Sequence, residues 1–386
     1  MSEDKPTGEA SEQKRAVTEQ DKQERKARIQ SDGRSSITRS IASAVVVKDG
    51  DMFFLCDPDG DVPLGGEHGL GLYYHDCRFL NGYEMKLADA KAEVLIATAT
   101  RGFMAIFELT NPDIKMPGGA LIKKQELGIE WKRVIDGSKL TLCDVFTFRN
   151  YARQQVTIPF TLTFQSEFEP LFTVRGMVRD KLGTLHSPRW KENALSLRYD
   201  GIDDIYRSLS VHFSPAPQST KDTTARFTVV LAPEESKEIV ISLCIAESKE
   251  QNEIEPKAQQ QLDTKNLERT LQDSSNQCLA DETEIRSDSL LLNSLMNRSL
   301  RDLHLLRTNI GGQEFFAAGV PWYVTLFGRD SLIASLQTLA YDAGIAEQGD
   351  DPHGGEEEAD GVELDDVDEG VAHIAVDGVA GDEAAE

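Results

Sequence analysis

The residues best suited to chemistry lie between positions 315 and 336, where an aromatic cluster is followed by a Gly-Arg-Asp turn and an apolar helical pattern. Three side chains there could hold a ligand: Trp322, Arg329 and Asp330. Aromatic faces stack on the apolar faces of sugar rings, while Arg and Asp side chains hydrogen-bond hydroxyl groups in fixed directions. The segment is therefore a candidate sugar-binding turn, whose residues would position a substrate.

A purely structural role also explains these residues. Asp330 would then be the N-cap of a helix that begins at Ser331, which is worth about 1 kcal/mol. Arg329 would pair with a neighbouring carboxylate, and Trp322 would fill a core together with Phe327. The spacing alone leaves both interpretations open.

The other reactive side chains favour structural roles. His75 and Asp76 are adjacent, and neighbouring residues of a strand point to opposite faces, so we expect neither a catalytic nor a metal-binding pair. A buried ion pair between Asp76 and Arg78 is the expected alternative. The odd number and wide spacing of the cysteines predict buried, reduced thiols rather than zinc sites or disulfides. These cysteines are Cys56, Cys77, Cys143, Cys244 and Cys278. We predict no metal and no cofactor.

The elements around these residues are predicted from the period of the apolar side chains. Between about residues 37 and 246 apolar and polar residues alternate, as in the run from Val156 to Phe164, which is typical of strands with one buried face. Pro159 lies in that run and cannot donate a hydrogen bond, so we expect an edge strand or a bulge there. Residues 44–47 and 52–55 flank an Asp-Gly pair, which predicts a hairpin. Many short strands with turn residues between them predict an antiparallel β-sandwich.

Helical spacing replaces this alternation near residue 284. One apolar stripe runs from Leu292 to Leu306, and a second helix is predicted from Ser331 to Tyr341. Two helices alone have too little surface to pack against, so this part is expected to open a larger helical domain. Uncovered apolar faces promote association, so self-association through them is a further expectation.

The predicted organisation has five parts with different compositions. They are a disordered polar arm, residues 1–35; the β-sandwich domain, 36–246; a linker, 247–283; the start of a helical domain, 284–345; and an acidic disordered tail, 346–386. The tail consists almost entirely of Gly, Ala, Val, Asp and Glu, and both a genuine acidic tail and an out-of-frame translation product fit that composition.

The tail also explains the net charge of −25, since residues 347–386 carry −16 of it and the rest of the chain only −9. No basic stripe suits a phosphate backbone, so nucleic acid is not an expected partner. No apolar run approaches the length of about 20 residues that spans a bilayer, and the N-terminus has no apolar targeting segment. We therefore predict a cytoplasmic protein that does not enter a membrane.

Three segments, in the same order along the chain, resemble bacterial glycogen-debranching-type proteins of the amylo-α-1,6-glucosidase family. Residues 317–332, AAGVPWYVTLFGRDSL, resemble the start of that family's helical barrel. Residues 71–80, GLYYHDCRFL, resemble an element of its N-terminal β-domain, with His75 where Arg is commoner and Cys77 where Thr is commoner. Residues 168–176, FEPLFTVRG, match a Phe-Glu-Val-Arg-Gly region of that domain less closely. The resemblance covers about residues 37–345.

The resemblance implies an α+β multidomain fold, with an antiparallel β-sandwich followed by the first helices of a truncated (α/α)6 toroid. It also implies that Arg329 and Asp330 bind hydroxyls of a terminal glucose, as an aromatic-x-Arg-Asp turn does in related glucoamylase-like enzymes, with Trp322 as a ring platform. Their role would be positioning rather than proton transfer. The implied partner is an α-glucan or oligosaccharide substrate.

Inverting glycoside hydrolysis needs two carboxyl groups about 6.5–9.5 Å apart, one as acid and one as base. The resemblance places them on later helices, which we do not find in this sequence, so we name no catalytic residue. The leading hypothesis is a truncated debranching-like glycoside hydrolase that contributes substrate-binding elements and is inactive, or nearly so, alone. The alternatives are a non-catalytic carbohydrate-binding or regulatory β-sandwich module, and an interaction protein that works through its acidic tail.

Overall fold

A computed structural model describes most of the chain between residues 41 and 339. The described residues are 41–65, 67–99, 101–116, 119–177, 183–250, 268–273, 286–310, 313–324 and 327–339. The chain divides into two units, Met1–Gly349 and Asp350–Glu386, and the second lies wholly outside the described residues. The predicted polar arm, the acidic tail, Cys278 and most of the predicted linker also lie outside them. None of the helices described is long and apolar enough to cross a membrane.

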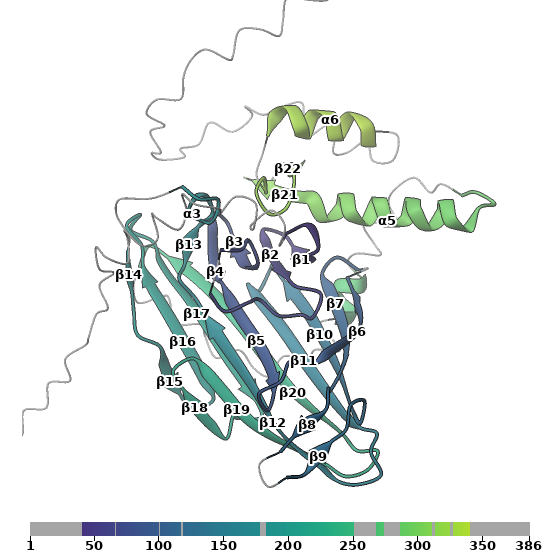
Figure 1. Ribbon diagram of the computed structural model, residues 1–386. Coiled ribbons are helices and arrows are strands. Elements are labelled where there is room, and N and C mark those ends of the chain that lie inside the picture. The colour runs from purple at the N-terminus through teal and green to yellow at the C-terminus, as the bar shows by residue number, and fades with distance from the viewer. Residues whose placement is uncertain are drawn as a thin grey trace, which may run out of the picture. The chain divides into compact units, whose positions relative to one another are not determined.

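The largest sheet in the described part of the chain has nine strands, and each paired strand in it is antiparallel to its neighbour (Figure 1). Its order is β14-β16-β17-β20-β11-β10-β7-β6, with β15 paired to β16. The strands are β6 (Glu93–Thr98), β7 (Met104–Thr110), β10 (Leu127–Asp136), β11 (Thr141–Asn150), β14 (Thr184–Leu185), β15 (Arg189–Lys191), β16 (Ala194–Asp200), β17 (Tyr206–Ser214) and β20 (Ser236–Ser248).

Two smaller antiparallel sheets complete the β-structure around the core. The four-stranded sheet has the order β18-β19-β12-β5, with β5 (Gly82–Leu87), β12 (Val156–Gln165), β18 (Ser219–Lys221) and β19 (Thr224–Leu231). The five-stranded sheet has the order β1-β2-β3-β4-β13, with β1 (Val45–Asp49), β2 (Met52–Cys56), β3 (Gly71–Tyr74), β4 (Cys77–Leu80) and β13 (Glu169–Pro170). Two short pairs also form: β8 (Ile114–Lys115) with β9 (Leu121–Ile122), and β21 (Arg307–Ile310) with β22 (Gln313–Phe316).

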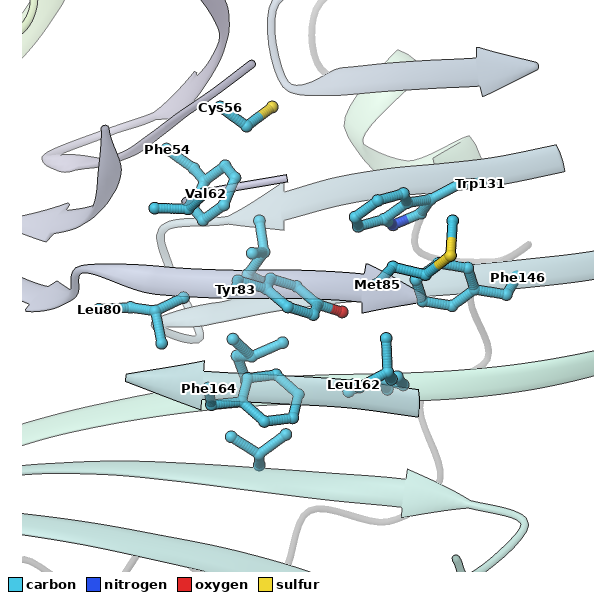
Figure 2. Packing of buried hydrophobic residues seen from close by; sticks show 14 of the residues in the cluster. Phe54, Cys56, Val62, Leu80, Tyr83, Met85, Trp131, Phe146, Leu162 and Phe164 are labelled. Atoms are coloured by element: carbon cyan, nitrogen blue, oxygen red, sulfur yellow. The ribbon is translucent and has the colours of Figure 1, made fainter. Parts of the chain in front are cut away.

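Aromatic side chains join the nine-stranded and four-stranded sheets across a common core. Phe160 of β12 lies with its ring centroid 5.2 Å from that of Phe146 and 4.9 Å from that of Phe148, both on β11. Tyr83 of β5 and Phe164 of β12 pack ring beside ring at 4.7 Å, as Figure 2 shows. Every second residue of β12 is buried, which is the pattern that the alternation predicted. The mostly antiparallel sheets and their shared core agree with the predicted β-sandwich.

The prediction of an edge strand at Pro159 is wrong. β12 lies inside its sheet, because it pairs with β19 on one side and with β5 on the other. The pairing with β5 begins at Phe160, so Pro159 lies just beyond the end of that ladder. Its carbonyl accepts a hydrogen bond from Ala88, and the missing N–H interrupts no strand pairing. Proline is therefore tolerated in this internal strand.

The hairpin predicted near the start of the domain is confirmed. β1 and β2 pair in register from Val45 with Cys56 to Asp49 with Met52. Gly50 in the turn has a φ of +54°, a conformation that costs glycine little because it has no Cβ.

Helices occupy the C-terminal part of the described chain, with one short helical turn, α3 (Leu171–Val174), inside the β-domain. α5 (Leu290–Leu306) begins after Ser289, whose Oγ accepts a hydrogen bond from the Leu292 N–H at 3.3 Å. α6 (Gly328–Thr338) begins three residues earlier than predicted. Residues 268–273, inside the predicted linker, are also helical, and Glu268 there makes ion pairs with Arg101 and Lys132.

Candidate functional site

The predicted sugar-binding residues lie in and after a tight turn that leads into α6. Gly319 and Tyr323 exchange two backbone hydrogen bonds, of 3.2 and 2.9 Å, which close the turn. α6 then begins at Gly328, and its N-cap is Phe327, which supplies no side-chain cap. The structural alternative for Asp330 as the N-cap is therefore wrong. Asp330 is the third residue of the helix, where the helix dipole favours a negative charge.

Arg329 and Asp330 form an exposed pair at the start of α6. Arg329 Nη2 lies 3.3 Å from Asp330 Oδ2, and the two side chains are 82% and 41% exposed. An exposed ion pair contributes little to stability, so this contact does not account for either residue by itself. Both groups keep hydrogen-bonding positions that a ligand hydroxyl could use.

Trp322 faces the β-domain rather than solvent. Its half-buried ring packs against the hydrophobic core, above Gly69. A Cβ at Gly69 would lie 3.0 Å from the Trp322 ring and 2.8 Å from the Ile41 side chain, so a larger residue there would push the indole away. This contact positions the turn on the β-domain.

Two exposed rings lie beside Arg329 and Asp330 in the sequence, and sequence reasoning gave them no binding role. Tyr323 and Phe327 make an edge-to-face contact at 5.5 Å between ring centroids, and they are 43% and 38% exposed. Phe327 was expected to fill a core with Trp322, and the structure does not bring these two rings together as a buried pair. The available signal was the position of both aromatic residues just ahead of the Gly-Arg-Asp turn.

The two β-domain segments that resembled the family meet each other at a buried ion pair. Glu169 on β13 accepts hydrogen bonds from Nε and Nη2 of Arg78 on β4, and the Nε bond is 3.0 Å long. Arg78 Nη1 also donates to the carbonyls of His68 and Leu70, at 2.6 and 3.1 Å. The expected pair between Asp76 and Arg78 is therefore wrong, since strand pairing places Glu169 opposite Arg78.

Both of these segments also lie next to the turn. Gly69, which supports Trp322, comes two residues before β3, and the carbonyl of Gly69 accepts a hydrogen bond from Tyr73 Oη at 2.9 Å. Arg175, at the end of α3, holds its guanidinium carbon 5.3 Å from the centroid of the Tyr323 ring. The segment 168–176 thus contacts Tyr323 through Arg175, and Gly69, which Tyr73 of the segment 71–80 holds by a hydrogen bond, supports Trp322.

The buried titratable groups of the sandwich are structural rather than catalytic. Burial, followed by the charge of the neighbouring Asp59, raises the pKa of the Asp61 carboxyl to about 7. This carboxyl is tied to the sandwich, because it accepts a hydrogen bond from the Met85 N–H at 2.9 Å and pairs with Lys91 at 3.1 Å. Burial also raises the pKa of the Cys56 thiol to about 12, which keeps it from acting as a nucleophile near neutral pH.

The other described cysteines, Cys77, Cys143 and Cys244, are likewise buried, and none of them forms a disulfide within the described residues. A search of the described residues finds no group of three His, Cys, Asp or Glu side chains that could hold a metal ion.

Comparisons with solved structures find distant similarity to carbohydrate-active enzymes. A bacterial glucoamylase complexed with acarbose is 13% identical, with a TM-score of 0.48, and the match covers 79% of this chain and 48% of that one. A candidate kojibiose phosphorylase from the human microbiome is 10% identical, with a TM-score of 0.41, covering 78% of this chain and 40% of that one. The chain thus spans less than half the length of either protein. No curated protein matches it.

A sequence profile identifies the β-domain more directly. The profile for the N-terminal domain of (some) glycogen debranching enzymes matches residues 47–242, which is about half of the chain. Those residues include most of the β-sandwich and two of the three segments that resembled the family. The chain therefore belongs to the family that is defined by the N-terminal domain of glycogen debranching enzymes.

Proposed function

We propose that the chain binds an α-glucan as the substrate-recognition part of a debranching-type glycoside hydrolase. Arg329 and Asp330 would hold hydroxyl groups of a terminal glucose, with an aromatic ring as the platform for the sugar face. The observation that carries this proposal is that Arg175 and Gly69, from the two family-like parts of the β-domain, both contact residues 322–323 just ahead of Arg329 and Asp330. The family model covers residues 47–242, which include Arg175 and Gly69 on the β-domain side of these contacts.

The chemistry of the turn suits a neutral sugar. A guanidinium donates, a carboxylate accepts, and each can bond hydroxyls in a directed way. Arg329 and Asp330 are exposed and adjacent, so a ligand can reach both without moving the sandwich. Exposed rings at Tyr323 and Phe327 add apolar faces on which a pyranose can stack.

The resemblance implied that Trp322 is the ring platform for the sugar. We keep this role for Trp322 only in part. Its ring packs on Gly69 and is half-buried, so a sugar would meet only the uncovered part. Tyr323, the next residue, offers a more open face. We therefore propose that Trp322 positions the turn and shares sugar contact with Tyr323.

We propose further that the chain does not hydrolyse glucan alone. A glycosidase needs two carboxyl groups on either side of the scissile bond, one protonated and one ionised. Burial raises the pKa of several described carboxyl groups, namely Asp49, Asp57, Asp61 and Glu108, and the one raised to about 7, Asp61, is buried against Met85 and Lys91. Glu169 is occupied by Arg78. The carboxyl pair would come from helices beyond those described, if α5 and α6 open a helical toroid.

Binding and hydrolysis can be measured separately on the full chain. We expect retarded migration in gels that contain glycogen, saturable binding of maltooligosaccharides by calorimetry, and no release of glucose from limit dextrin above background. Asp330→Asn keeps the size of the side chain but loses the carboxylate, so it should weaken binding by about 10-fold or more. Because Asp330 is not a helix cap, the same change should cost no more than about 1 kcal/mol of unfolding free energy.

Two results would count against this proposal. Full glucan affinity in Asp330→Asn would remove the sugar-binding role of the turn, and it would favour a carbohydrate-binding module that uses another face of the sandwich. Undetectable binding by the unmodified chain would remove the function itself.

A further inference from the structure

A row of three exposed groups extends from the β-domain to the start of α6. The guanidinium of Arg175 lies over the ring of Tyr323, 5.3 Å from its centroid, and the ring of Phe327 lies 5.5 Å beyond Tyr323. Phe327 is directly followed in sequence by the turn that carries Arg329 and Asp330. Arg175 therefore lies at the end of the row that is farther from Asp330.

The backbone that presents Arg175 is held firmly on the sandwich. The Leu171 N–H donates to the Asp76 carbonyl at 2.7 Å, and the Arg175 N–H donates to the Leu171 carbonyl at 3.1 Å. Gly176 ends the turn with a φ of +96°, which strains other residues. Glu169, just before α3, is fixed by its buried ion pair with Arg78. The position of Arg175 is thus set by the β-domain.

The side chain of Arg175 keeps its donors available. It is exposed, and among the described residues it contacts the face of the Tyr323 ring. A guanidinium that stacks on a ring still directs its N–H groups outward in its own plane. A hydroxyl-rich ligand lying along Tyr323 would meet these donors at its edge.

We infer that Arg175 binds a sugar unit at least two places along the glucan from the one held by Arg329 and Asp330, so that the β-domain senses the length of the glucan. This inference rests on the proposed function. Asp330 and Arg175 are separated by two aromatic rings, each about as large as a pyranose, so neither glucose nor maltose can span the row. A longer oligosaccharide gains the Arg175 contact, whereas a short one does not.

The test compares maltose with maltoheptaose on the full chain, by calorimetric titration. Arg175→Met removes the charge and the donors but keeps the length of the side chain. We expect it to lower the affinity for maltoheptaose about 5- to 20-fold, as the loss of a charge-assisted hydrogen bond would, and to change maltose affinity less than about 2-fold. Arg175→Lys keeps the charge without the planar fork, so its affinity for maltoheptaose should lie between those of the unmodified chain and of Arg175→Met.

The chain offers a matched control elsewhere on its surface. Arg149, at the end of β11, is also exposed and lies 5.4 Å from the ring centroid of Tyr151. Arg149→Met removes the same kind of cation–π contact away from residues 319–330, so both sugars should bind as they do to the unmodified chain. Far-ultraviolet circular dichroism and the unfolding midpoint check that each variant is folded. If Arg175→Met does not fold, Arg175→Lys serves as the test.

The outcomes separate this inference from the proposed function. Equal losses for both sugars in the Arg175 variants, or no loss for either, overturn the role in chain length while leaving glucan binding intact. The same selective loss in Arg149→Met overturns it as well. An unmodified chain that binds neither sugar overturns the proposed function and the inference with it.

Discussion

Asp61 is the residue whose charge conflicts most clearly with its surroundings. Its side chain is buried, and burial is the largest cause that raises its pKa to about 7. Lys91 and the Met85 N–H oppose this shift without cancelling it. The folded protein therefore holds a proton on Asp61 between about pH 4 and pH 7, where the unfolded chain has released it.

We expect Asp61→Asn to stabilise the protein above pH 7. A carboxyl with a raised pKa makes stability fall as pH rises through this window, and Asn has no such dependence while still accepting the Met85 bond. The difference in unfolding free energy should be on the order of 2–4 kcal/mol at pH 8 and should vanish near pH 3. Urea unfolding at several pH values measures it. A variant equally less stable at every pH would contradict the assignment.

Glu169 shows the opposite case, in which a buried charge is well paired. Glu169→Gln would leave the Arg78 guanidinium buried without its carboxylate, so we expect a loss of about 3–5 kcal/mol of unfolding free energy. The exposed pair between Arg298 and Asp302 on α5 is the control, and Asp302→Asn should cost about 0.5 kcal/mol or less. Similar losses in urea unfolding for the two variants would show that the Arg78–Glu169 pair has no special role.

At the scale of elements, α6 presents its two faces in an unusual way. The buried side chains of the helix are small and polar: Ser331, Ser335 and Thr338. Its large apolar side chains Leu332, Ile333 and Leu336 are exposed, as is Leu339 at its C-cap. None of the residues of α5 is fully buried. The predicted apolar stripe of α6 is therefore left uncovered, and that of α5 is exposed at Leu292 and Leu295 and partly covered nearer its end, as expected for helices that pack against further helices or a second copy of the chain.

We expect these faces to bind a hydrophobic dye and to cause association of the isolated chain. Replacing Leu332 and Leu336 by Gln should lower dye fluorescence and shift the chain towards monomer in sedimentation, with little change in unfolding free energy, because neither side chain is packed. Val230→Gln, a change of another exposed apolar residue on β19, serves as the control and should alter neither signal. Dye binding that persists unchanged in the double variant would show that the dye binds an apolar surface other than that of α6.

At the scale of the whole molecule, one core unites the three larger sheets. The Arg133 guanidinium lies at its centre, with both side chains of the Arg133–Asp144 pair fully buried and with the Phe54 ring 4.2 Å away. The C-terminal segment adds fewer contacts, among them hydrogen bonds from Lys48 Nζ to the Arg307 carbonyl at 3.2 Å and to Thr308 Oγ1 at 3.5 Å. The sandwich should therefore hold together without α5 and α6.

A fragment of residues 37–246 tests this directly. Its circular dichroism should show mainly strand, and its unfolding in urea should be cooperative, because nearly all strand pairs lie within it. We expect the fragment to be somewhat less stable than the full chain, since it loses the partners of Lys48. A predominantly helical spectrum would exclude the sandwich.

In the strands, the sequence by itself determined which faces are buried and where several turns fall. Alternation along β12 and the Asp-Gly pair before β2 are local patterns, and steric preference and burial act on them within a few residues. The three segments near Tyr74, Arg175 and Tyr323 were also visible as separate motifs. Their types and order were sufficient to indicate the family.

Only the tertiary structure decided which of these patterns meet. Arg78 pairs with Glu169 rather than with the nearby Asp76, and β12 gains β5 as a neighbour, because strands distant in sequence pair by register. Trp322, the ring platform that the resemblance implied, packs against Gly69, whereas Tyr323, to which sequence reasoning assigned no binding role, is exposed. Local periodicity specifies the face of each residue, whereas its partner depends on long-range packing, which no short stretch of sequence contains.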